Sequence, residues 1–518
     1  YNRLGAVNPA GMIYALRRDV VPINANYGLT PGNVRLRDGK RARPLILRMN
    51  VGQKLQINFQ NLLANNRPHE DQPATRTASV HVIGLQLVNS ITDDGSNVGQ
   101  NPSSLVGPGG SITYTYFAER EGNHLFYSTA ATTGGEGDGG SLAMGLFGMV
   151  NVEPKNAEWY RSQVTRQELG YATTGRTADD HPIINYDAVY PAGHPRAGLP
   201  VLRILHNGEI VHGDLNAIIT GPNKGCFTPN GDCPAPGAPD PAGATYRSNP
   251  AEPNRNQPFR EFSLVYHDEI KAVQAFPQFF EDPVLAHTLH SVRDAFAINY
   301  GTGGIGAEIL ANRLGVGPMA DCTECFYEEF FLSSWTVGDP AMIVDNPSST
   351  RVDGNGNKIP TAPKATKAFF PEDPSNVYHG YLNDHTKMRV THAGPKEHHI
   401  HHLHAHQWFH TPDSDNSTTL DSQAFGPGSS FTTEILHGGG GNRSKTAGDS
   451  IFHCHFYPHF AMGMWELWRV HDVFEEGTKL GADGRPRTDV PNRALPDSEI
   501  LTGTPIPAVV PIPTLAMA

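Results

Sequence analysis

The stretch from His453 to Met464 holds residue types that bind soft transition metals. It reads His-Cys-His-Phe-Tyr-Pro-His-Phe-Ala-Met-Gly-Met. Neighbouring side chains of a strand point to opposite faces, so Cys454 points one way and His453 and His455 point the other. A thiolate, the imidazole of His459 and the weak axial thioether of Met464 form the soft ligand set of a blue copper site. The two flanking histidines could hold a second metal on the far face.

A second group of histidines precedes this stretch by about fifty residues. Two of them, His402 and His404, share a face if the segment is extended. The group consists of His398, His399, His401, His402, His404 and His406. Zinc is a rival metal, but one thiolate with two imidazoles and a thioether favours copper over a closed tetrahedral zinc site. A histidine tract that binds metal without catalysis stays open as an alternative.

The bulk properties favour a large, turn-rich β protein. The chain has 518 residues with 54 Gly and 42 Pro, and only 18% of its residues are charged. The net charge of −12 argues against nucleic-acid binding, which usually shows a basic face. No apolar run reaches the length of a membrane span. The chain starts at Tyr1 without an initiator Met, so we expect a mature or processed form.

Four cysteines remain beside Cys454, which is compatible with two disulfides and a periplasmic or secreted location. Cys226 and Cys233 lie in the turn-rich GCFTPNGDC, and Cys322 and Cys325 form C-T-E-C. The pairing cannot be deduced from the sequence. Plain thiols, or a metal or redox pair at C-T-E-C, are the alternatives.

The pattern along the chain predicts β units that would position these residues. Strands are predicted at 44–50, 55–59, 111–117, 145–152 and 261–266, and a short helix at 305–314. The segment 215–258 is rich in Pro, Gly and Asn and is interpreted as a long surface loop. We divide the chain into a first domain at 1–155, a middle domain at 156–365, a third domain at 366–475 and a Pro-rich tail at 476–518.

The motif pair H-x-x-H-x-H and H-C-H-x-x-x-H-x-x-x-x-M resembles the carboxyl-terminal signature of the multicopper oxidases. The resemblance implies an all-β fold of about three tandem cupredoxin-like Greek-key β-sandwich domains. It also implies one-electron oxidation of a substrate at a type 1 copper and reduction of oxygen at a trinuclear copper cluster. It covers the first and last β units well and 156–365 only loosely. The segment from Ser414 to Phe452 also resembles large bacterial multicopper oxidases, a group that includes manganese oxidases.

Ligand roles follow from this resemblance, residue by residue. The type 1 copper would take His399, Cys454, His459 and Met464. The type 2 copper would take His81 and His402, and the type 3 pair would take His404, His453 and His455. Asp94 would be the acidic residue near the cluster that assists proton transfer.

The chain departs from the family pattern at three cluster positions. Ile83, Tyr127 and Thr129 stand where the family has histidines, so five of eight cluster histidines remain. Isoleucine cannot ligate copper, and a tyrosine would have to lose a proton from a pKa of about 10. We call the place of this cluster the lower site. It could hold one or two coppers, use the nearby His124, or be completed by another chain or a lost part of the same polypeptide.

The main hypothesis is a copper-dependent oxidoreductase of the multicopper oxidase type. A small reducing substrate, either a phenol, an amine or a metal ion such as Mn(II), would give an electron near His459 or His399, whose imidazole edges would face outward. Oxygen would be the acceptor at the lower site. The rival hypothesis is a type 1 copper protein that transfers electrons or binds copper without reducing oxygen. A purely structural cupredoxin scaffold is the third.

Two further groups of residues could bind metal. These are His267-Asp268-Glu269 and His287-x-x-His290. We interpret both as polar surface residues.

Overall fold

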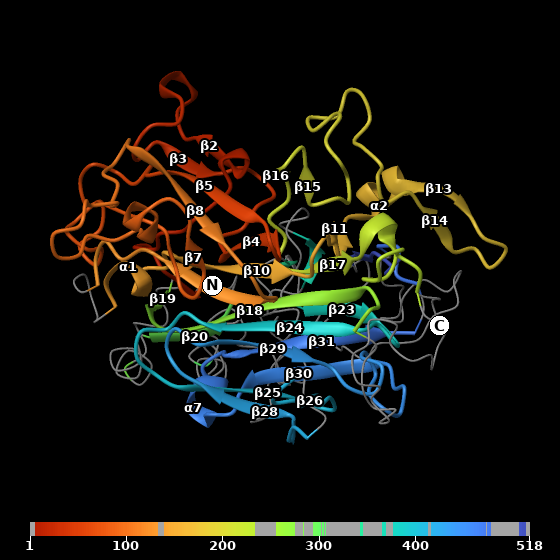
Figure 1. The fold of residues 1–518 in the computed structure, drawn as a ribbon. Helices are drawn as coiled ribbons and strands as arrows, with labels where there is room; N and C mark the ends of the chain where they lie inside the picture. Colours follow the sequence, from red (N-terminus) through yellow and green to blue (C-terminus); the bar gives the residue numbers. More distant parts are fainter. Residues whose placement is uncertain are drawn as a thin grey trace, which may run out of the picture.

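The computed structural model (Figure 1) describes residues 6–132, 139–233, 255–274, 283, 294–301, 303–304, 306, 342–344, 365–368, 377–412, 416–472, 474–477 and 507–513. Most of the predicted helix at 305–314, the C-T-E-C pair and the His287 and His290 pair lie outside these residues. None of the helices in the described part has the length and hydropathy that crossing a membrane requires.

The first sandwich is formed by residues up to about 153. One sheet has the order β4 (Leu45–Asn50), β10 (Phe147–Glu153), β9 (Gly122–Tyr127) and β6 (His81–Val82). The other consists of β5 (Lys54–Gln60), β8 (Ser111–Phe117) and β7 (Gln86–Leu87). Apolar side chains that alternate along these strands pack between the sheets, including Tyr114, Tyr116, Phe126 and Val150. The strands predicted in this region are confirmed.

The second sandwich carries the cysteine and histidine motifs. Its first sheet has the order β11 (Glu158–Arg161), β17 (Ala217–Thr220), β18 (Phe259–Lys271), β24 (Thr386–His392) and β29 (Ser430–Glu434), with β20 (Asp294–Ile298) also paired to β18. Its second sheet has the order β23 (Val377–Tyr381), β31 (Trp465–His471), β30 (Gly448–Cys454), β25 (His399–Leu403) and β28 (Ser422–Phe425). Figure 1 shows the layer of β18, β24 and β29 between the first sandwich and the layer of β30, β25 and β28.

One sheet of the second sandwich runs across the predicted boundary at residue 366. Strand β18 pairs in parallel with β24, so that Tyr266 lies opposite His392. Aromatic and aliphatic side chains fill the space between the two sheets, among them Phe262, Trp408, Phe452 and Trp468. The predicted domain boundaries stay predictions, but the described fold is all-β, as the composition indicated.

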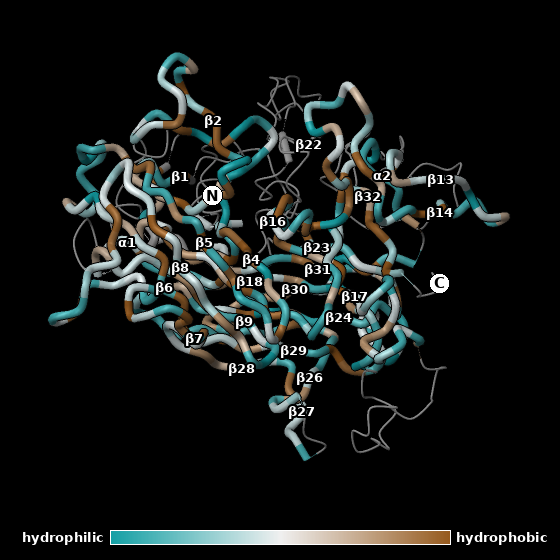
Figure 2. The backbone as a smooth tube through the Cα atoms, turned by 45° about the horizontal axis from the view of Figure 1, so that its top comes forward, coloured by the Kyte–Doolittle hydropathy of each residue, from teal (hydrophilic) through white to brown (hydrophobic). Residues whose placement is uncertain are grey.

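Short pairs and turns complete the described part. The pairs are β1 (Ala6–Val7) with β19 (Val273–Gln274), β2 (Val20–Pro22) with β3 (Val34–Leu36), β12 (Gln163–Val164) with β32 (Ala508–Val509), β13 (Thr173–Arg176) with β14 (Pro182–Ile184), β15 (Leu205–His206) with β16 (Glu209–Ile210), β21 (Met342–Val344) with β22 (Ala365–Ala368), and β26 (Trp408–Phe409) with β27 (Thr419–Leu420). The α-helices are α1 (Gly140–Ala143), α2 (Arg166–Ala172) and α7 (Tyr457–Ala461). The 3-10 turns are η1 (Arg17–Asp19), η2 (Ala25–Tyr27), η3 (Ile91–Asp94) and η4 (Pro222–Lys224). In Figure 2 the outlying loops are mostly teal or white, and brown segments concentrate along strands in the middle of the molecule.

Two segments that the sequence indicated as loops contain buried strands. Within the predicted loop at 215–258, β17 is fully buried because it pairs with β11 on one side and β18 on the other. Within the predicted tail at 476–518, residues 508–510 are also fully buried. Strand β32 pairs with β12, and the Val510 amide donates to the Ser162 carbonyl at 2.9 Å. Prolines around both segments exclude a helix but permit short extended strands.

A buried network of charges joins the two sandwiches. Arg389 of β24 lies 3.1 Å from Glu261 and 3.0 Å from Glu153, and Arg48 lies 3.0 Å from Glu261. Arg48 and Glu153 belong to the first sandwich, and all four side chains are at most 1% exposed. Burial raises the pKa of Glu261, but Arg48 and Arg389 more than offset this and lower the pKa to about 2. The network fixes the first sandwich against β18 and β24.

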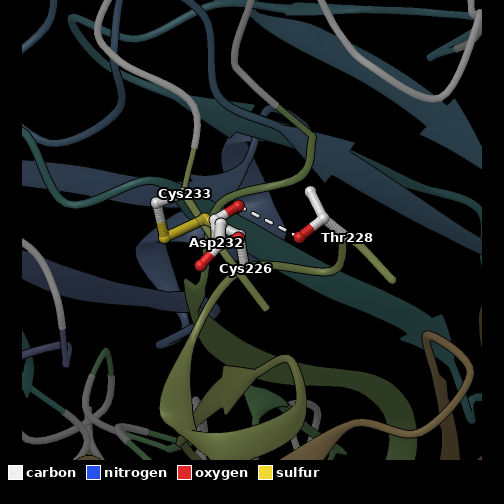
Figure 3. The surroundings of a disulfide bond; sticks show 4 residues. All are labelled: Cys226, Thr228, Asp232 and Cys233. Atoms are coloured by element: carbon white, nitrogen blue, oxygen red, sulfur yellow. Dashed lines mark hydrogen bonds between the residues drawn. A yellow bond between two sulfur atoms is a disulfide. The ribbon is translucent and has the colours of Figure 1, made fainter. Parts of the chain in front are cut away.

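The structure pairs two of the four remaining cysteines. Cys226 and Cys233 form a disulfide, and the hydroxyl of Thr228 donates to the carbonyl of Asp232 at 3.0 Å within the loop that the disulfide closes (Figure 3). Cys454 is buried and is the free cysteine of the described residues. The predicted disulfide chemistry is thus confirmed for the first pair.

Acidification is expected to destabilise the protein through His212, whose ring nitrogen Nε2 lies 2.8 Å from the carbonyl of Pro200. Burial, aided by Arg161, lowers the pKa of His212 to about 3. Below about pH 6.5 the unfolded chain therefore binds a proton at His212 that the folded chain does not bind. The free energy of unfolding is highest above that pH and falls as the pH drops toward 3. His212→Gln should reduce the loss of unfolding free energy between pH 7.5 and 4.5 by about 3 kcal/mol in urea titrations. An unchanged pH dependence would contradict this assignment.

Candidate metal centres

Three ligand atoms converge inside the second sandwich. His399 Nδ1 lies 3.2 Å from His459 Nδ1, and the Cys454 sulfur lies 3.8 Å from the first nitrogen and 3.6 Å from the second. We call these three residues the inner site. His399 and Cys454 are fully buried, and His459 is partly exposed. The predicted grouping of these residues is what the structure shows.

Local chain geometry brings the inner site together. β25 and β30 pair antiparallel with His401 opposite Cys454, which places His399 beside the end of β30. After Cys454 the chain turns through the single-turn helix α7, which contains Pro458 in its first turn. Gly463 then adopts a φ of 118°, a conformation that glycine reaches without strain. The Met464 carbonyl accepts the Cys454 amide at 3.0 Å, so the loop folds back onto its own strand.

The electrostatics of the inner site suit a soft metal ion. Burial raises the pKa of the Cys454 thiol to about 11, and burial together with His459 lowers the pKa of His399 to about 3. Burial also lowers the pKa of His459. Both imidazoles are therefore neutral with lone pairs to donate, and a bound cation would favour the thiolate that the apolar surroundings disfavour. The donor set of two nitrogens and one sulfur fits copper.

Met464 lies fully buried in the core that also contains Cys454. Its amide donates to the His459 carbonyl at 3.0 Å. The predicted axial ligand is thus bonded to the backbone of His459 and packs in the same core as Cys454.

Four histidines gather on the other face of the same sheet. His404 Nε2 lies 3.1 Å from His453 Nε2, and the ring centre of His402 lies 4.5 Å from that of His404, 4.9 Å from His453 and 5.0 Å from His455. We call these four the outer site. His453 is buried, whereas His404 and His455 are exposed. The alternation of β30 separates the two sites, as the sequence predicted.

His401, which lies between the two sets of ligands, belongs to neither site. It is fully buried, and its Nδ1 makes a 2.8 Å hydrogen bond with the Tyr266 hydroxyl. Its ring packs against Trp408 in the core.

The hydrogen-bonding contacts of His81 lie within the first sandwich. His81 Nδ1 lies 2.8 Å from the Asp94 carbonyl and 3.3 Å from an Asp94 carboxylate oxygen, and among the described side chains no group of three potential metal ligands includes His81. The first sandwich packs on the sheet of β24 and β29, where Asn123 donates to the Val390 carbonyl at 2.8 Å. The outer site lies on the other sheet, on its outward face. The joint site of His81 with the carboxyl-terminal histidines therefore stays a prediction.

The three departures from the family pattern have structural roles in the first sandwich. Ile83 and Tyr127 pack against the same hydrophobic core, and burial raises the pKa of the Tyr127 hydroxyl. Thr129 donates its hydroxyl to the Gly95 carbonyl at 2.6 Å. His124, considered as a substitute, bonds through Nδ1 to the Ile83 carbonyl at 2.9 Å.

The interpretation of His267 and Asp268 as surface residues is wrong. Both are fully buried, and an Asp268 carboxylate oxygen lies 3.0 Å from His399 Nε2. Burial raises the pKa of Asp268 to about 6. The parallel pairing of β18 with β24 brings Asp268 to the inner site, and no local motif signals this pairing of segments more than a hundred residues apart.

The expectation that both imidazole edges face outward is also corrected. His399 is closed off by Asp268 and the core, so of the two rings only His459 is partly exposed. Phe296 stacks on His459 with a centroid distance of 4.1 Å. Phe456 and Tyr457 beside it are 42% and 64% exposed.

Residues 34–157 match the family model described as multicopper oxidase. Over this segment the chain is similar to multicopper oxidases. The match agrees with the family that the carboxyl-terminal motif indicated. The matched segment contains His81, Ile83, Tyr127 and Thr129, whereas the inner and outer sites lie beyond it. None of the curated proteins matches the chain.

Solved structures of copper proteins resemble this chain at low identity. A copper nitrite reductase from Nitrosomonas europaea is 11% identical, with 89% of this chain and 88% of that one covered and a TM-score of 0.35. A blue copper oxidase from Nitrosomonas europaea is 11% identical, with coverages of 96% and 98% and a TM-score of 0.36. A further multicopper oxidase is 12% identical, with coverages of 89% and 93% and a TM-score of 0.34.

Proposed function

We propose that the protein is a copper-dependent oxidoreductase that passes electrons from a small reducing substrate through a type 1 copper to a second copper site, with dioxygen as acceptor. The observation that carries this proposal is the arrangement at the end of β30. Cys454 joins two imidazoles inside the sandwich, while its neighbours His453 and His455 join two others outside. Bound copper would supply one-electron chemistry at both sites.

The inner site would hold the type 1 copper through His399, Cys454, His459 and Met464. Because His399 is fully buried, a reducing substrate approaches His459. Phe296 and Phe456 flank this ring, with centroid distances of 4.1 Å and 5.4 Å. Aromatic rings of a phenol or an aromatic amine can pack against such side chains, which favours these substrates over Mn(II).

The outer site would hold the second copper through His402, His404, His453 and His455. Burial lowers the pKa of His453 to about 4, so its imidazole is neutral and able to ligate. Since His404 and His455 are exposed, another chain can approach this face and complete it. His81, with Asp94 as a proton donor beside it, would then act from such a chain.

The rival proposal is a type 1 copper protein without oxygen reduction. It is favoured by the packing of Ile83 and Tyr127 in a hydrophobic core and by the Thr129 hydroxyl bonded to Gly95. These three positions supply no ligand to any cluster. A periplasmic or secreted location is proposed for either function, because the Cys226–Cys233 disulfide needs an oxidising compartment.

A double variant tests the main proposal. His404→Ala/His455→Ala should keep the intense blue absorption, lower the copper content by at least one ion per chain, and abolish oxygen uptake with a phenol, a diamine or Mn(II). Both side chains are exposed, so the fold should tolerate their loss. His410→Ala, an exposed histidine outside the site, is the matched control. Unchanged oxygen uptake in the double variant would reject the outer site, and a blue protein that never consumes oxygen would select the rival.

A further inference from the structure

Asp268 lies near the end of β18, with its carboxylate inside the protein beside the inner site. Its side chain is fully buried, and the Oδ2 oxygen lies 3.0 Å from His399 Nε2. On the opposite side of the His399 ring, Nδ1 points to His459 and Cys454. The two nitrogens of one imidazole thus face different partners, a carboxylate and the metal ligands.

Gly394 leaves the space that the Asp268 carboxylate occupies. A Cβ built on Gly394 would overlap the Asp268 carboxylate. Gly394 therefore permits the close approach of the chain before β25 to the end of β18. Any larger residue at this position has to displace Asp268 from His399.

His392 is the other imidazole near Asp268, but both of its nitrogens are engaged. Nε2 lies 2.7 Å from the Glu397 carbonyl, and Nδ1 accepts the Gly394 amide at 3.0 Å. Because the carbonyl can only accept, the proton of His392 sits on Nε2, and neither nitrogen has a lone pair free for a metal. The His392 ring stacks on His399 at a centroid distance of 4.3 Å and holds it in plane. The partner of Asp268 is therefore His399.

We infer that Asp268 is a positioning residue whose carboxylate, 3.0 Å from His399 Nε2 but not aligned for a hydrogen bond in this arrangement, favours the Nε2–H form of the ring and so keeps Nδ1 unprotonated and aimed at the type 1 copper. The inference depends on the proposed function, since it concerns a ligand of that copper. A carboxylate behind a metal-bound imidazole fixes its tautomer and makes it a stronger donor. The negative charge also stabilises the oxidised copper relative to the reduced one, so it lowers the reduction potential.

The same contact determines which imidazole of the inner site is accessible among the described residues. With its Nε2 turned to a buried carboxylate, His399 presents no edge to solvent, and His459 is left as the imidazole that a reductant can reach. Asp268 comes from the part of the chain between the two motif-bearing regions. That part of the chain thus supplies a residue that acts on the type 1 copper through His399.

Asp268→Asn tests the inference, because asparagine keeps the shape and removes the charge. The preference of the inner site for Cu(II) over Cu(I) should fall about tenfold, which raises the reduction potential of the blue copper by about 59 mV. Glu269→Gln is the matched control: it removes a charge one residue away, from a side chain that pairs with Lys396 at 3.2 Å. The reduction potential of the Glu269→Gln protein should change clearly less than that of the Asp268→Asn protein.

Gly394→Ala is the second variant, because it displaces the carboxylate with Asp268 intact, and its potential should shift in the same direction. A raised potential or a loss of copper in Asp268→Asn and Gly394→Ala, with Glu269→Gln close to the parent, supports the role. An unchanged potential in Asp268→Asn, or equal shifts in Asp268→Asn and Glu269→Gln, overturns it. If the parent protein shows no blue copper, it is the proposed function that fails.

Discussion

We expect that replacing Cys454 by serine abolishes the blue absorption that the proposed type 1 copper would give the copper-loaded protein, and leaves the fold in place. The colour of a type 1 site comes from the bond between copper and a thiolate, and a serine hydroxyl is a hard, protonated ligand that copper does not prefer at this position. Loss of a group that only hydrogen-bonds to a metal ligand costs about 10–100-fold in metal affinity. Loss of the thiolate ligand itself should therefore weaken copper binding at the inner site by more than about 100-fold. Serine is close to cysteine in size, so the core between the two sheets stays filled.

Absorption spectroscopy and copper titration measure this effect directly. The double variant Cys226→Ser/Cys233→Ser is the control, since it removes the disulfide and spares the free thiol. It should retain the blue band at lower stability. A Cys454→Ser protein that stays blue would refute the inner site.

Replacing Arg389 by methionine destabilises the protein by about 3–5 kcal/mol. The guanidinium lies within 3.1 Å of Glu121, Glu153 and Glu261, and the latter two are fully buried. Removing the cation leaves like charges without their main counterion in a dry interface, and this is far more costly than the loss of an exposed pair. A fall in Tm of about 3–5 °C is expected if the chain unfolds as one unit.

Chemical denaturation of Arg389→Met and of Arg35→Met tests this difference. Arg35 makes a 2.8 Å ion pair with Asp38 in which both side chains are mostly exposed, so its loss should cost less than about 1 kcal/mol. Replacing Glu261 by leucine together with Arg389 should recover part of the loss, because Arg48 and Glu153 can then pair with each other. If the single and double variants were equally unstable, lost packing rather than unpaired charge would be the cause.

The sequence predicted the features that depend on local pattern. Alternation along β30 places Cys454 and its two neighbours on opposite faces whatever the rest of the chain does. The strands at 44–50 and 111–117 follow from apolar periodicity in the same way. The inner site could be predicted in outline because its residues lie in two short segments.

Features that depend on which strands meet could not be predicted. Asp268 reaches His399 only because β18 pairs with β24, a register set by the packing of two whole sheets. Whether His81 reaches the outer site depends on which face of the second sandwich the first sandwich covers. The burial of β17 and β32 likewise follows from partners that lie far away in the sequence.

The pairing of β12 with β32 can form only after the ribosome has synthesised both strands, which lie far apart in the sequence. Val164 leaves the ribosome early, but its neighbour Ala508 follows about 340 residues later. At roughly 5–20 residues per second, the nascent chain carries an open edge for roughly 20–70 s. Chaperones that bind exposed strands have that interval in which to act, and slowing or speeding translation should change the yield of native protein.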